Sequence, residues 1–267
     1  MSALAQEIGQ PVMRWMATYA AAQWALLDGD IAEGERLAAE AFALGTESGQ
    51  PDAAPYFGGA MNHAMWQRGT SGDALVQLEA SAVDNPGVPA FYASVARAAA
   101  QCGRHDRAQE LLDAAVAVKF QNIPSDLLWT SAIVTYAETA IVLDDVSAAA
   151  VLYETLEPWP DQMAYMGIRA EGPIAHYLGA LATMLGRYDD ADRHFATALD
   201  LDTRVPAPFH LARTRLEHGR MLVARGRDGD VEAAVADFTR ARAVAVERGY
   251  GEVARRAEAA LGALDVD

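Results

Sequence analysis

The residue types that could carry chemistry in this chain are six histidines, one cysteine and an excess of carboxylates. A zinc site needs cysteine and histidine ligands at short fixed spacings, and neither H-E-x-x-H nor a Cys/His cluster occurs. Asp228–Glu232 lacks the alternating oxygen ligands of a calcium loop. Gly45–Gly49 has the wrong spacing for a serine nucleophile elbow. Cys102 is interpreted as a packing residue, because the expected helix C-terminus there disfavours a thiolate. The sequence predicts no metal, no cofactor and no enzymatic activity.

The charge balance argues against several kinds of partner. The formal net charge is −16 at pH 7. A surface of this sign repels phosphate, so we expect no direct nucleic-acid binding and no docking on anionic membranes. Met1–Pro11 lacks the basic start and apolar run of a secretion signal, and apolar stretches such as Ala132–Leu143 are too short to span a bilayer. One cysteine cannot form an intramolecular disulfide, so we expect a cytoplasmic location.

Regularly spaced turn signals indicate the elements that must position these residues. A glycine or aspartate that can end a helix recurs about every 40 residues and is followed by small residues. The flanking stretches carry apolar residues at helical spacing, such as Leu111, Leu112 and Ala115. The pattern predicts an all-α chain without β-strands, forming one repeat domain over 1–267. The helical hairpins are expected near 10–45, 53–83, 88–118, 125–156, 171–201 and 207–248, with a capping helix near 251–263.

The longest interruption of the helical pattern lies at 157–170. Pro158 and Pro160 lack an amide donor and disfavour helix in the residue before them. We therefore expect a hinge or lid between the fourth and fifth hairpins.

One segment closely resembles a tetratricopeptide (TPR) repeat. It contains Tyr177–Ala182, then Leu185–Ala191, then Phe195 with Ala198 and Leu199. Small residues within these runs permit two antiparallel helices to approach closely, while leucine and phenylalanine fill the space between them. The resemblance implies a TPR-like α-α superhelix, or solenoid, of about six hairpins.

A second resemblance extends over most of the chain. The motifs Leu152–Trp159, Gly172–Gly179, Pro208–Thr214 and Gly219–Gly226 resemble the C-terminal TPR-like region of large bacterial signalling proteins. Those proteins join an AAA-type ATPase to an adenylate/guanylate cyclase or to a LuxR-type DNA-binding domain. The resemblance implies a scaffold or sensor role, with an ATPase, cyclase or DNA-binding effector as partner in cis or in trans. The only lysine, Lys119, has no glycine near it, so this chain has no phosphate-binding P-loop.

The inner face of a TPR-like superhelix is its usual ligand surface, and it is built from the first helix of each hairpin. Repeat positions project one set of side chains onto this face: Tyr19, Gln23, Tyr56, His63, Trp66, Gln67, Arg97, Gln101, Glu138, His176, Thr183, Arg213 and Arg220. Aromatic residues at one end and arginines further along would suit a peptide, or a small molecule with a ring and a carboxylate or phosphate. In the alternative interpretation, Trp66 and Tyr56 only pack between repeats, and Arg97 pairs with Glu138.

These observations predict a non-catalytic scaffold or sensor module that binds its partner in the concave groove. Two alternatives remain at this stage. One is a stand-alone repeat receptor for a peptide or small molecule. The other is an enzyme on an α-solenoid scaffold, which would require Glu138, His176 or His63 to lie within hydrogen-bond distance of one another. The sequence leaves open whether the chain is part of a larger protein.

Overall fold

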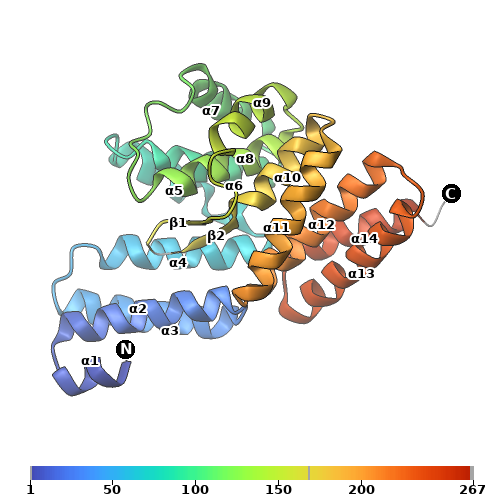
Figure 1. Cartoon of the computed structure of the whole chain (residues 1–267). Helices are drawn as coiled ribbons and strands as arrows, with labels where there is room; N and C mark the ends of the chain where they lie inside the picture. The colour runs from blue at the N-terminus through green and yellow to red at the C-terminus, as the bar shows by residue number, and fades with distance from the viewer. Residues whose placement is uncertain (1, 168, 265–267) are drawn as a thin grey trace.

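The computed structural model describes residues 2–167 and 169–264. Most of these residues are helical, which confirms the all-α class (Figure 1). The helices are α1 (Ser2–Ile8), α2 (Pro11–Leu27), α3 (Ile31–Glu47), α4 (Ala53–Arg68), the short 3-10 helix η1 (Ser71–Ala74), α5 (Leu75–Asp84), α6 (Ala90–Gln101), α7 (His105–Ala117), α8 (Trp129–Leu143), α9 (Val146–Leu156), α10 (Ile174–Met184), α11 (Tyr188–Arg204), α12 (Pro208–Arg225), α13 (Asp230–Arg248) and α14 (Gly251–Leu264). None of the helices in these described ranges is both long enough and apolar enough to cross a membrane.

Local capping explains where many of the helices begin and end. The side chains of Asp30 and Asp145 accept hydrogen bonds from backbone amides three residues later, at 3.0 Å in both cases, and so start α3 and α9. Gly69 and Gly226 adopt the left-handed conformation that ends α4 and α12. These signals are contiguous in sequence, so the positions of the turns can be read without tertiary information.

Helices that follow one another in sequence pack together along most of the chain. Examples are α2 with α3, α10 with α11, and α12 with α13. Glycines allow the close approach: a Cβ at Gly179 would lie 2.8 Å from the ring of Phe195, and one at Gly219 would lie 2.5 Å from the ring of Phe238. Any side chain at these two positions would push the paired helices apart.

The expectation that no strand would form is wrong, because a small antiparallel hairpin lies in the interrupted region. Strand β1 (Met163–Tyr165) pairs with β2 (Ala170–Pro173), with Ala164 opposite Gly172. Strands of three and four residues are too short to show the two-residue alternation on which a strand prediction depends. Figure 1 places the hairpin in the middle of the molecule, between α4 and the group formed by α6, α8 and α10. The hairpin contacts α8, α10, α11 and α12.

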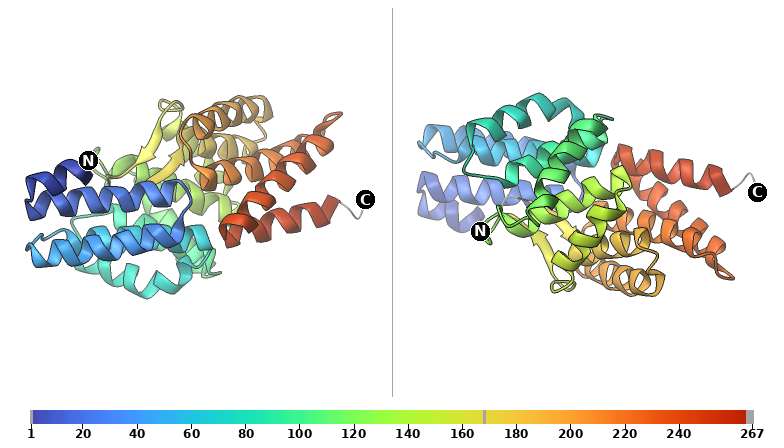
Figure 2. Two further views of the ribbon diagram at one scale, coloured as in Figure 1. Left: turned by 90° about the horizontal axis from the view of Figure 1, so that it is seen from below. Right: turned by 90° about the horizontal axis from the view of Figure 1, so that it is seen from above.

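The first and last helical pairs also meet, as both views in Figure 2 show. Gly29, in the turn after α2, lies directly against the hydroxyl of Tyr250, which precedes α14. Gly69, at the end of α4, packs on the backbone of Glu252 in α14. An open groove of about 640 Å³ lies at this junction, lined by residues such as Asp30, Arg68 and Arg248. These contacts couple the stability of α2 and α4 to that of α14, although the helices are far apart in sequence.

Candidate functional site

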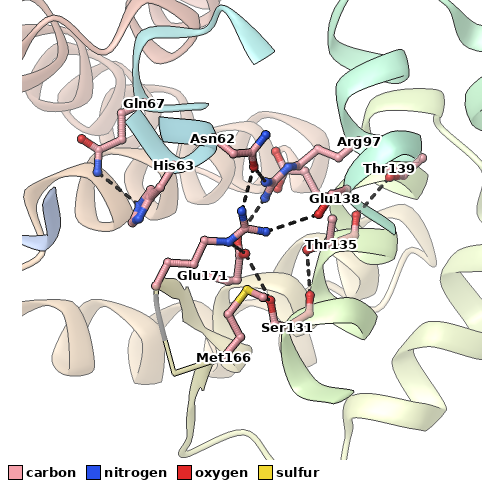
Figure 3. Close-up of polar contacts among 12 residues, drawn as sticks. Asn62, His63, Gln67, Arg97, Ser131, Thr135, Glu138, Thr139, Met166 and Glu171 are labelled. Carbon is pink, nitrogen blue, oxygen red and sulfur yellow. Dashed lines mark hydrogen bonds and ion pairs between the residues drawn. The ribbon is translucent and has the colours of Figure 1, made fainter. Parts of the chain in front are cut away.

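A cluster of buried polar and aromatic side chains, here called the polar centre, lies where α4, α6, α8, α10 and α12 face the hairpin. Figure 3 shows part of it. Its members are at most 6% exposed. They are Asn62, His63, Trp66, Gln67, Arg97, Ser131, Glu138, Arg169, Glu171, Tyr177, His210 and Arg213. A buried cluster with this many charged groups is uncommon, because each charge must be compensated by a partner.

Glu171, on β2, is the carboxylate at the middle of the polar centre. Its Oε2 accepts a hydrogen bond from Nη1 of Arg97 at 2.9 Å, and its Oε1 accepts one from Nε of Arg169 at 2.5 Å. Ser131 Oγ donates to the same Oε1 at 3.2 Å. Burial raises the pKa of Glu171, but the Arg169 and Arg97 guanidiniums outweigh burial and hold the pKa well below its usual range. Glu171 is therefore ionised throughout the physiological pH range.

Asn62 and Ser94 complete the surroundings of the Arg169 guanidinium. Asn62 Oδ1 accepts from Nη1 of Arg169 at 2.7 Å and from Nη2 of Arg97 at 3.3 Å. Ser94 Oγ accepts from Nη2 of Arg169 at 3.4 Å. Glu171 and Asn62 thus each accept hydrogen bonds from both arginines, whereas Ser94 accepts from Arg169 alone.

Trp66 lies beneath two guanidinium groups. The Cζ atoms of Arg97 and Arg213 are 4.3 and 4.6 Å from the centre of the Trp66 ring. Arg213 forms an ion pair with Glu138 and donates to the hydroxyl of Tyr177 at 3.3 Å. The alternative pairing of Arg97 with Glu138 is therefore wrong. Arg97 instead pairs with Glu171 of β2, and Glu138 of α8 pairs with Arg213.

The polar centre holds more positive than negative charge. Arg97, Arg169 and Arg213 face two carboxylates, those of Glu138 and Glu171. Burial lowers the pKa of Arg169, although the carboxylate of Glu171 opposes this effect. The π face of Trp66 and the Asn62 carbonyl partly replace the missing carboxylate. The charges of the polar centre are therefore compensated by groups of the protein itself.

The buried histidines are neutral. Gln67 Nε2 donates to the carbonyl of Leu26 at 2.8 Å and lies 3.2 Å from Nε2 of His63, which accordingly acts as an acceptor. Burial lowers the pKa of His63 to about 3, and it also lowers the pKa of His210 and His176 well below the ordinary value. These rings therefore cannot serve as acid-base groups near neutral pH without a large change in environment.

A second cluster, here called the aromatic end, lies where α2 packs against α4. The rings of Trp15, Tyr19 and Tyr56 have centroids 4.7 to 5.5 Å apart, and both tyrosines are half-buried. Burial raises the pKa of Tyr19, and the nearby phenols of Tyr56 and Tyr165 raise it further, which places the exposed Tyr165 of β1 beside the cluster. Gln23 lines a cavity of about 10 Å³ here, close to the minimum for one water molecule. The hairpin thus links the polar centre to the aromatic end.

The structure brings most of the predicted inner-face residues into these two clusters. His63, Trp66, Gln67, Arg97, Glu138 and Arg213 lie in the polar centre, and Tyr19, Gln23 and Tyr56 lie at the aromatic end. His176 lies beside the polar centre with its ring against Tyr177. Three predicted residues lie outside both clusters, namely the half-buried Gln101, Thr183, which donates to the Gly179 carbonyl, and the exposed Arg220, which pairs with Glu217.

Sequence reasoning missed Trp15 of the aromatic end and six members of the polar centre. The six are Asn62, Ser131, Arg169, Glu171, Tyr177 and His210. Arg169 and Glu171 lie in or next to the segment interpreted as an interruption, and no local pattern indicates that it folds inward. Glu138, His176 and His63 bond to Arg213, Thr214 and Gln67 respectively and not to one another. Across residues 2–167 and 169–264, no group of three or more histidine, cysteine, aspartate and glutamate side chains is arranged to hold a metal ion.

The chain was compared with protein-family models and with curated proteins, and neither comparison found a match. The resemblances described above therefore rest on the quoted residues alone.

Proposed function

We propose that this chain is a non-catalytic binding module, a TPR-like superhelix of about six hairpins with a capping helix. It acts as a scaffold or sensor of a bacterial signal-transduction or transcription-regulatory protein and binds a peptide or protein partner on its inner face. The observation that carries the proposal is the aromatic end, where the half-buried Tyr19 and Tyr56 lie beside the exposed Tyr165 of β1. The pairwise packing of consecutive helices supports the same proposal.

The chemistry of the aromatic end suits recognition. Trp, Tyr and Arg are the side chains that contribute most to binding energy in protein interfaces. The half-buried Tyr19 and Tyr56 supply rigid aromatic surface at the accessible end, and the hairpin tip with Tyr165 lies beside them. A partner that contacts this end also contacts the hairpin. It changes the arrangement of the helices only if it binds one arrangement more tightly than another.

Affinity capture with matched variants tests the proposal. The immobilised wild-type chain, Tyr56→Ala and Trp24→Ala are each exposed to lysate of the source cell, and captured proteins are quantified by mass spectrometry. Trp24 is 64% exposed and lies outside both clusters, so it controls for the loss of an aromatic side chain. We expect one partner that the wild type and Trp24→Ala retain and that Tyr56→Ala loses by about tenfold or more.

Two outcomes would contradict this function. If Tyr56→Ala captures the same proteins in the same amounts, the inner face is not the binding surface. If no protein is captured, and a small metabolite instead raises the melting temperature of the wild type, the chain is a small-molecule receptor.

A further inference from the structure

The guanidinium of Arg169 occupies a site that is built to hold such a group. Its three nitrogens donate to Glu171 Oε1, Asn62 Oδ1 and Ser94 Oγ at 2.5, 2.7 and 3.4 Å. The acceptors come from β2, α4 and α6, so three separate elements converge on one planar cation. A lysine ammonium is a single compact donor centre and does not match acceptors spread around a plane.

The occupant of this site comes from a short segment of the same chain. Arg169 is 4% exposed and immediately precedes β2, whereas Tyr165 on the paired strand is 47% exposed. Glu171, by contrast, is held by Arg97 and Ser131 and is separated from α10 by only two residues. Departure of Arg169 would therefore leave the acceptor side of the site in place.

We propose that the site formed by Glu171, Asn62 and Ser94 recognises an arginine side chain of a partner peptide, and that Arg169 is its internal occupant in the free chain. This inference rests on the proposed function, since it specifies the partner of the same inner face. The partner's guanidinium replaces that of Arg169, which then turns toward solvent.

The charges favour this exchange over other ligands. Arg169 shares Glu171 with Arg97, and the polar centre holds three guanidiniums for two carboxylates. Replacing one guanidinium by another leaves this balance unchanged, whereas adding a cation worsens it. The net charge of −16 also attracts a basic peptide and speeds its encounter with the chain.

Chemical complementation of a variant tests the proposal. Arg169→Ala removes the occupant and leaves the acceptors, and Arg255→Ala removes an arginine whose side chain is 64% exposed. We expect methylguanidinium at about 10 mM to raise the melting temperature of Arg169→Ala by about 4 °C relative to sodium chloride at the same concentration. Urea, which is planar but uncharged, should give no such rise, and Arg255→Ala should not respond to methylguanidinium.

A binding measurement tests whether Arg169 and an added arginine ligand compete for the same site. By calorimetry, acetyl-arginine-amide should bind Arg169→Ala about tenfold more tightly than it binds the wild type, in which Arg169 must first leave. The citrulline analogue, which lacks the charge, should bind neither protein. If Arg169→Ala does not fold alone, methylguanidinium should restore its helical circular dichroism signal and urea should not.

The proposal is overturned if methylguanidinium neither stabilises nor restores Arg169→Ala, or if acetyl-arginine-amide binds the variant and the wild type equally. These results are separate from those for the proposed function. Capture of a partner that depends on Tyr56, without complementation of Arg169→Ala, would retain the binding module and exclude the arginine site. Complementation of Arg169→Ala by methylguanidinium without any captured partner would retain the arginine site and exclude the binding module.

Discussion

At the scale of single residues, buried ionisable groups determine how the protein responds to pH. Asp202 on α11 is 2% exposed, and its Oδ2 accepts a hydrogen bond from Thr214 at 2.8 Å. Burial raises the pKa of Asp202 to about 7, and the Thr214 hydrogen bond opposes this only in part. The folded state therefore binds this proton more tightly than the unfolded state does. Stability from Asp202 is fully present below about pH 4 and is lost as the pH rises through about 7.

This behaviour predicts the effect of Asp202→Asn. The amide has the shape of the protonated acid and cannot ionise, so the variant should lack the loss of stability on the alkaline side. We expect its free energy of unfolding to match the wild type at about pH 4 and to exceed it by about 2 to 4 kcal/mol at about pH 8. Urea unfolding at a series of pH values measures the difference. Asp200→Asn, whose side chain is 65% exposed, is the control. Parallel curves for Asp202→Asn and wild type would contradict the assignment.

At the scale of elements, paired helices are held together by contacts that only glycine permits. On α12, Gly219 lies so close to Phe238 of α13 that an added methyl group would overlap the ring. Gly262 on α14 has no neighbouring atom within 4 Å of the position that its Cβ would occupy. The same chemical change should therefore have opposite effects at the two positions.

We expect Gly219→Ala to lower the free energy of unfolding by about 1 to 3 kcal/mol, because α12 and α13 must separate. Gly262→Ala should raise it by about 0.5 to 1 kcal/mol, because alanine restricts the unfolded chain and favours helix. Denaturant unfolding of both variants gives the comparison. Equal stability of the two variants would show that α12 and α13 are not tightly packed at Gly219 in solution.

At the scale of the whole molecule, the contact between the two ends of the chain couples helices that are far apart in sequence. Gly29 and Gly49 both adopt positive φ angles, of 83° and 67°. Alanine should strain the backbone equally at both positions. Only Gly29 faces another part of the chain, the Tyr250 side chain before α14.

Hydrogen exchange monitored by mass spectrometry should separate the two variants. In Gly29→Ala we expect faster amide exchange in α2 and also at the junction of α13 with α14, because the end-to-end contact is lost. In Gly49→Ala the faster exchange should stay near the end of α3. Exchange changes confined to α2 and α3 in both variants would mean that the two ends unfold independently.

The turns and the helical character of the chain could be predicted from the sequence, because the signals that produce them lie within a few residues of one another. Asp30 caps the helix that follows it, and Gly226 ends the helix that precedes it. Helical spacing on the first helix of each hairpin also located half of the polar centre, Trp66 and Arg97 among them, since spacing indicates which side of a helix a residue occupies.

Only the tertiary structure decided how those residues are paired and what lies between them. Arg97 meets Glu171 across 74 positions, and Arg169 meets Asn62 across 107. One sequence offers many carboxylates to each arginine, and the choice among them depends on which elements are brought together by burial of apolar surface. The inward placement of the short hairpin is decided in the same way, since three or four residues carry no periodic signal and are held by partners on distant helices.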